Sequence, residues 1–134
     1  MGTPAPSAPD PATGSAVCHL LAQYCVLLDS GRFEDWTALF VADGRLEMKR
    51  RAVVGHDQLL DFARNAPRGV HLCGLPVLAA TADVVSSTCP WNFVDIATGT
   101  QVVGYYHDEI AWSDGRHRFR SRRIEMHFPP VRKG

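Results

Sequence analysis

The sequence lacks the features that define several large classes of protein. Its 134 residues include 14 basic and 14 acidic side chains, so its formal net charge at pH 7 is zero. A neutral chain has no overall attraction to nucleic acid or to an anionic membrane surface. We also expect no apolar run that approaches the length of a membrane span. From these absences we expect no nucleic-acid partner and no membrane partner.

Cysteine is scarce, and its spacing carries no metal-binding pattern. Cys18, Cys25, Cys73 and Cys89 form no CxxC pair and show no Cys/His ligand spacing. This pattern favours buried, reduced thiols in a cytosolic protein. The first fourteen residues are rich in proline and alanine and lack the basic and apolar regions of a signal peptide. We therefore expect a disordered leader at 1–14 and a cytoplasmic protein.

Hydrophobic periodicity predicts helices in the first half of the chain and strands in the second. The predicted helices cover residues 15–31, 33–40 and 56–66, with short strands at 45–48 and 52–54. Longer strands are predicted at 70–80, 84–96, 101–112 and 116–128. This order predicts one α+β domain at 15–130, in which a curved antiparallel sheet wraps around the helices, and a C-terminal tail at 131–134.

The last two strands form the clearest hairpin in the sequence. Asp114 and Gly115 both tolerate the positive φ that a type I′ turn requires. Beyond Phe119 the apolar residues of the last strand change from odd to even numbers, which predicts a β-bulge near residues 121–123.

Counting back from this turn places charged and phenolic side chains on a face that should be apolar. Asp108 is predicted to pair with Ser121, and Tyr106 with Arg123. The same face carries Trp112, His117, Ile110 and Phe119. A desolvated charge needs a partner, so we expect Asp108 to contact Arg123 or His71.

The opposite face of the hairpin is predicted to carry Arg116, Arg118, Arg120 and Arg122. Expected cross-strand pairs are Glu109 with Arg120 and His107 with Arg122. We interpret this arginine ladder as a solvated or subunit-facing surface rather than a nucleic-acid site. It predicts a homodimer joined through the outer face of the sheet.

Three segments resemble the SnoaL-like branch of the NTF2-like superfamily, which includes ketosteroid isomerase-like and scytalone dehydratase-like proteins. They are YCVLLD with GRFEDW at 24–36, HLCGLP at 71–76, and GYYHD with the rest of the hairpin at 104–123. The resemblance implies a cone-shaped, cystatin-like fold around a cavity. Leu75 stands where many relatives have Asn, and His117 replaces a common Trp. The superfamily hosts dehydratases, isomerases, cyclases, epoxide hydrolases and binding modules, so it does not fix the activity.

The resemblance also implies catalytic roles for individual residues. Asp29 lies in the last turn of the first helix, where the helix dipole disfavours a carboxylate. In scytalone dehydratase-like relatives this aspartate pairs with a histidine that His71 matches, and a phenol at the position of Tyr24 polarises the substrate carbonyl. Asp108 would orient His71 or serve as a second acid/base. Each residue also has a structural alternative that stays open. Asp29 could lie at an exposed helix end, and His71 could be a hydrogen-bonded core or surface residue. Tyr24 could serve only in core packing, and Asp108 could form an ion pair with Arg123.

The remaining candidates are expected to contact the substrate. They are Tyr106, Trp36, Phe119, Trp112, Leu75 and Asn92. For Asn92 the prediction depends on strand parity, because either Asn92 or Trp91 faces inward and Pro90 can disturb the register.

Together these residues predict a cofactor-free enzyme for a mostly apolar small molecule with a carbonyl or hydroxyl group. His71, oriented by Asp29, would move a proton in a dehydration, isomerisation or polyketide-type cyclisation. In one alternative Asp29 or Asp108 activates water, as in epoxide hydrolases of the superfamily. In another the protein is a non-catalytic ligand-binding or assembly domain. No metal site is expected, because His71, Asp29 and Asp108 lack ligand spacing.

Overall fold

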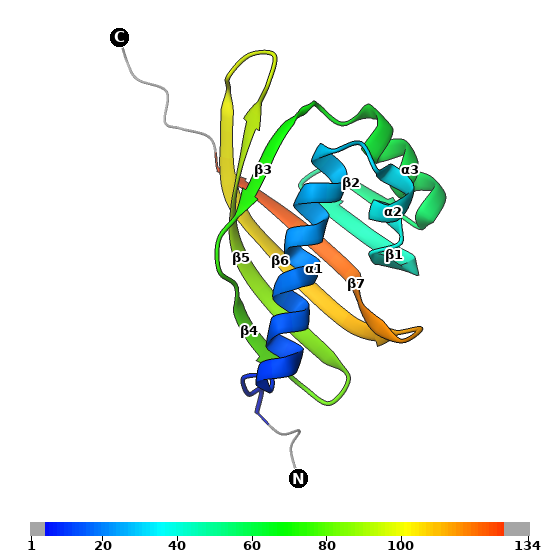
Figure 1. Ribbon diagram of the computed structural model, residues 1–134, viewed down its shortest axis with the longest axis vertical. Coiled ribbons are helices and arrows are strands. Elements are labelled where there is room, and N and C mark those ends of the chain that lie inside the picture. Colours follow the sequence, from blue (N-terminus) through cyan, green and yellow to red (C-terminus); the bar gives the residue numbers. More distant parts are fainter. Residues whose placement is uncertain (1–4, 128–134) are drawn as a thin grey trace.

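The computed structural model describes residues 5–127, and within them three helices lie on one side of a curved sheet (Figure 1). The helices are α1 (Pro11–Asp29), α2 (Phe33–Thr37) and α3 (His56–Asn65). The strands are β1 (Phe40–Met48), β2 (Arg51–Val54), β3 (Gly69–Cys73), β4 (Val77–Ala80), β5 (Val84–Asp95), β6 (Gln101–Ser113) and β7 (Arg116–His127). This architecture confirms the predicted α+β class with helices preceding a curved sheet.

The sheet has the strand order β2-β1-β7-β6-β5-β3, and β4 also pairs with β5. Its strands are antiparallel except for β1 and β7, which are parallel. Helix α1 crosses the concave face, while α2 and α3 cover it beside β1 and β2 (Figure 1). The concave face is therefore the inside of the molecule.

Helix α1 begins earlier than the sequence predicts. Asp10 caps it, since its Oδ1 accepts a hydrogen bond of 2.9 Å from the backbone N–H of Thr13, and Pro11 suits the first helical turn. Residues 11–14, expected in the leader, are thus helical. Ser7 forms an isolated β-bridge with Ala80.

Helix α1 also corrects the expectation about apolar runs. It has 19 residues and is long and apolar enough, by length and composition, to cross a membrane. Its buried residues are Val17, Leu20, Leu21, Tyr24, Cys25 and Leu28, and they pack in the main core. This one-sided burial is typical of the core helix of a folded domain.

Two other predicted elements have different boundaries. Phe40 is not helical but starts β1, opposite Phe119 in β7. The predicted strand at 70–80 is divided into β3 and β4, because Pro76 in the segment between them has no backbone N–H for the sheet. The predicted end of the last strand, Phe128, lies outside the described residues.

The hairpin turn is confirmed, with φ of 48° at Asp114 and 82° at Gly115. The bulge, however, lies closer to the turn than predicted. Ile110 pairs with Phe119 and Glu109 pairs with Ser121, so Arg120 is the additional residue. This bulge bends β7 and moves the following even-numbered residues onto the concave face.

The bulge changes every predicted pair beyond it. Asp108 lies opposite Arg122 rather than Ser121, and Tyr106 lies opposite Ile124 rather than Arg123. Arg122 is therefore fully buried, so the predicted outer-face ladder is wrong at this position. The predicted cross-strand pairs on the outer face are wrong too. In the structure His107 lies opposite Arg123, and Glu109 lies opposite Ser121.

Candidate active site

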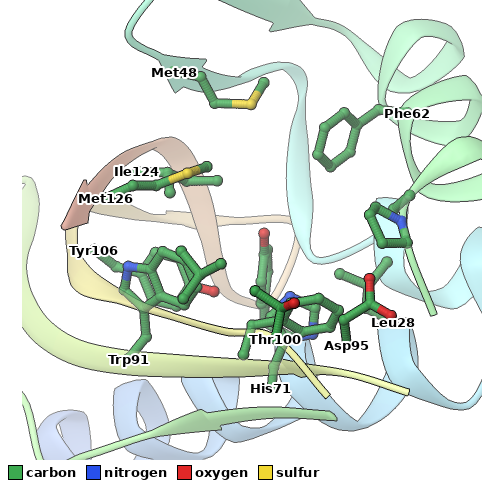
Figure 2. A pocket seen from close by; sticks show the side chains of 15 residues that line it. Leu28, Met48, Phe62, His71, Trp91, Asp95, Thr100, Tyr106, Ile124 and Met126 are labelled. Carbon is green, nitrogen blue, oxygen red and sulfur yellow. The ribbon is translucent and has the colours of Figure 1, made fainter. Parts of the chain in front are cut away.

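The concave face of the sheet, α1 and α3 line a cavity of about 260 Å³ that is open to solvent on one side (Figure 2). It is lined almost entirely by apolar and aromatic side chains, as a site for a small organic ligand requires. Figure 2 shows Met48 and Phe62 across the cavity from Trp91, Tyr106 and His71. Further lining residues are Tyr24, Leu28, Ala66, Pro67, Phe93, Asp95, Thr100, Val102, Ile124 and Met126.

His71 and Asp29 are in direct contact beside this cavity. The Nδ1 atom of His71 lies 2.6 Å from Oδ1 of Asp29, and the backbone N–H of His71 donates to Oδ2 at 2.7 Å. Both side chains are mostly buried, with 15% and 19% of their surface exposed. The two donors offset the unfavourable position of Asp29 at a helix C-terminus.

Local packing fixes the orientation of His71. A Cβ atom at Gly69 would lie 2.1 Å from the carbonyl oxygen of Val94, so only glycine lets β3 approach β5 this closely. Two residues later the His71 ring packs on Phe93, with ring centroids 4.5 Å apart. Because the carboxylate of Asp29 accepts at Nδ1, the neutral imidazole carries its proton there. Nε2 is then the unprotonated nitrogen of the neutral ring.

Tyr24 and Tyr106 are the two phenols in the cavity wall. Both are almost fully buried, and their ring centroids lie 5.6 Å apart in an edge-on arrangement. Burial raises the pKa of each phenol well above its ordinary value of 10, and the positive charge of Arg122 partly opposes this rise. At neutral pH both hydroxyl groups are therefore protonated hydrogen-bond donors.

Asp108 is buried, but its partner is not one of the two predicted residues. Its Oδ1 and Oδ2 atoms accept hydrogen bonds of 2.7 and 3.0 Å from Nε and Nη2 of Arg122. Both side chains are 0% exposed. The predicted contact with Arg123 or His71 is wrong because the bulge at Arg120 brings Arg122 inward. Asp108 does not line the cavity.

The other predicted contact residues divide into core and surface positions. Trp36 and Phe119 are fully buried in the aromatic core and do not line the cavity. Leu75 and Trp112 are 88% and 66% exposed, because one lies in the break between β3 and β4 and the other lies near the hairpin turn. Asn92 does not line the cavity either.

Strand β5 contributes residues that the sequence prediction left open. Its odd-numbered residues from Val85 to Phe93 are buried, and Trp91 and Phe93 line the cavity. The higher apolar and aromatic content of the odd positions could have decided the parity. Asp95, the last residue of β5, and Thr100, just before β6, also line the cavity and had no sequence signal of their own.

All four cysteines are free. The neighbouring thiols of Cys25 and Cys89 lower the pKa of Cys73. Within residues 5–127, no group of three or more His, Cys, Asp or Glu side chains is arranged to hold a metal ion. Asp108 in particular lies with Arg122 and not with Asp29 and His71.

A model of the SnoaL-like domain matches residues 12–123, so the chain belongs to the SnoaL-like family. No curated protein sequence matches it. The fold is that of NTF2-like proteins, a class with cystatin-like architecture.

Three solved structures illustrate this likeness. An NTF2-like protein with a cystatin-like fold from Novosphingobium aromaticivorans has 18% identity and a TM-score of 0.77, over 84% of this chain and 80% of that one. A hexachlorocyclohexane dehydrochlorinase, LinA Type2, has 16% identity and a TM-score of 0.74, over 91% and 90%. A putative scytalone dehydratase from N. aromaticivorans has 20% identity and a TM-score of 0.68, over 88% of each chain. At these identities the likeness shows the fold.

Proposed function

We propose that the protein is a cofactor-free acid/base enzyme acting on a mostly apolar small molecule with a carbonyl or hydroxyl group. The observation that carries this proposal is the hydrogen bond between Asp29 and Nδ1 of His71, at the wall of an apolar cavity. A histidine held in one tautomer by a carboxylate is a suitable general base. The reaction class is dehydration, isomerisation or cyclisation.

The proposed mechanism assigns one task to each polar group. Nε2 of His71 removes a proton from the carbon next to the substrate oxygen function, and Asp29 stabilises the imidazolium that forms. Tyr24 and Tyr106 donate hydrogen bonds toward the oxygen on which negative charge develops. The apolar wall strengthens these interactions, because charges interact more strongly where water is excluded.

The fold neighbours support this chemistry by analogy. A dehydratase removes water and a dehydrochlorinase removes hydrogen chloride, and both names describe eliminations in which a proton leaves the substrate. Activation of water by a carboxylate is less well supported. Both oxygens of Asp29 accept hydrogen bonds from His71, and both oxygens of Asp108 accept from Arg122.

Proton abstraction can be tested without the natural substrate. β-Tetralone is a neutral bicyclic ketone whose carbon next to the carbonyl carries exchangeable hydrogens. We expect the protein to accelerate their exchange with deuterium oxide, measured by proton NMR. His71→Ala should slow this exchange by about a hundredfold or more, since a positioned general base contributes that much.

The matched control is His117→Ala, because His117 packs on Trp112 and does not line the cavity. This variant should exchange at the wild-type rate. Equal rates for wild type and His71→Ala would contradict the proposal. A ligand co-purified in native mass spectrometry without any exchange activity would instead favour the non-catalytic binding domain.

We also propose that the protein forms a homodimer through the outer face of the sheet. Exposed apolar residues from neighbouring strands adjoin there, since Val70 and Leu72 of β3 lie beside β5, which in turn pairs with Val103 and Tyr105 of β6. Exposed apolar side chains grouped on one face in this way are typical of an interface. Light scattering at micromolar concentration should return twice the 14.7 kDa mass of one chain. The mass of one chain would reject the dimer.

A further inference from the structure

The guanidinium of Arg122 lies among the rings that carry the cavity phenols. Its Cζ atom is 3.7 Å from the ring centroid of Tyr106 and 4.2 Å from that of Tyr24. The ring of Phe119 is 4.6 Å away on the core side. A cation over the face of an aromatic ring is attracted to its electron density, most strongly where water is excluded. Arg122 thus contacts both phenol rings at once.

Stability alone is a poor explanation for this arrangement. A buried ion pair is often no more stabilising than apolar side chains of the same volume, because both charges lose their hydration. Asp108 uses both oxygens on Arg122, while Nη1 of Arg122 is buried and has no hydrogen-bond partner within residues 5–127. The core therefore holds an incompletely satisfied charge in contact with the cavity wall.

We propose that Arg122, held by Asp108, is a positioning residue for Tyr24 and Tyr106: it fixes both rings and stabilises negative charge that develops on their hydroxyl groups during the reaction. This inference rests on the proposed function. Arg122 does not line the cavity, so it acts through the two phenols and not on the substrate directly.

The electrostatic consequence follows from the groups that face the phenols. Burial raises the pKa of Tyr24 most, the guanidinium of Arg122 lowers it, and the thiol of Cys25 and the carboxylate of Asp108 raise it by smaller amounts. For Tyr106 the same groups act in the same directions, and the neighbouring phenol of Tyr24 raises the pKa further. Arg122 is therefore the group that makes hydrogen-bond donation by these phenols more favourable as charge builds on the substrate oxygen.

The test replaces the tyrosines with difluorotyrosine, whose phenol is far more acidic, and follows each ionisation by fluorine NMR. The chain has three tyrosines, and Tyr105 on the outer face is the internal reference. In Arg122→Met/Asp108→Leu, which keeps an apolar pair in place of the ions, the ionisation constants of Tyr24 and Tyr106 should fall about tenfold, or one pH unit. Tyr105 should titrate unchanged.

Two further variants separate charge from packing. Arg122→Lys retains a cation, so the ionisation constants of Tyr24 and Tyr106 should stay close to their wild-type values. Arg118 lies on the same strand but is hydrogen-bonded to the backbone of Ala38, so Arg118→Met should not change these constants. If the apolar pair does not fold, Arg122→Gln/Asp108→Asn keeps polar side chains of similar shape and predicts the same tenfold change.

Unchanged titration of Tyr24 and Tyr106 in a folded charge-free variant would overturn the inference. The titration needs no turnover, so its failure is distinct from failure of the β-tetralone exchange.

Discussion

The two faces of the β6–β7 hairpin carry ion pairs in opposite environments. On the concave face, Arg122 and Asp108 are fully buried and form two hydrogen bonds. On the convex face, Glu125 accepts from His107 at 2.9 Å and also from His127, with all three side chains partly exposed. Water screens the second cluster but not the first. How strongly an ion pair interacts in this protein therefore depends on which face of the sheet carries it.

The largest expected difference between the faces is in stability. Asp108→Ala leaves a buried guanidinium without its partner and should lower the free energy of unfolding by about 3 to 5 kcal/mol. Glu125→Ala on the convex face should cause a far smaller change, because its partners remain hydrated. Urea unfolding of both variants measures the difference. Equal losses would show that the concave pair is not shielded from water.

An intermediate effect on stability is expected at alkaline pH, where the buried phenols of the concave face ionise less readily than an exposed phenol. Burial raises the pKa of folded Tyr24 above its ordinary value of 10.0, so the unfolded chain ionises first and stability falls as pH rises beyond that value. Tyr24→Phe removes one group from this linkage and should make the fall shallower by about 1.4 kcal/mol per pH unit.

Urea unfolding over the alkaline range gives this slope. Tyr105→Phe, on the exposed convex face, is the matched control and should leave the slope as in the wild type. A slope that does not change in Tyr24→Phe would mean that this phenol is accessible to water in the folded protein.

The smallest effect is expected from the convex cluster in acid. Hydrogen bonds from His127 and His107 lower the pKa of Glu125 below its ordinary value of 4.5. Its contribution to stability is therefore present above that value and is lost as pH falls through the lower folded pKa. Glu125→Gln should remove this acid dependence, and high salt should weaken it in the wild type. Acid titrations followed by circular dichroism test both effects.

The sequence was sufficient for the elements whose signals are local. The Asp114-Gly115 turn and the spacing of apolar residues in α1 and α3 depend on residues close in the chain, and these elements were predicted with small errors at their ends. The contact between Asp29 and His71 spans 42 positions and was predicted from a family resemblance, not from periodicity.

The error at Arg122 shows where local signals fail. Alternation identifies which residues share a face only while the register is unbroken, and the bulge at Arg120 reverses it for the rest of β7. The sequence indicated the change of parity but not its exact residue, so Arg122 was predicted on the outer face. For Asn92 and Trp91 the sequence did not decide which of the two side chains faces inward. In the structure the odd-numbered residues of β5 are buried, so Trp91 faces inward.

The most direct test of the account is the tautomer of His71, because the proposed base depends on it. Nitrogen NMR of the histidine rings should show that the neutral form of His71 carries its proton on Nδ1 and leaves Nε2 unprotonated, and β-tetralone should shift the Nε2 resonance. In Asp29→Asn the preference for the Nδ1 proton should weaken. A His71 protonated at Nε2 in the wild type, or one unaffected by Asp29→Asn, would contradict the account.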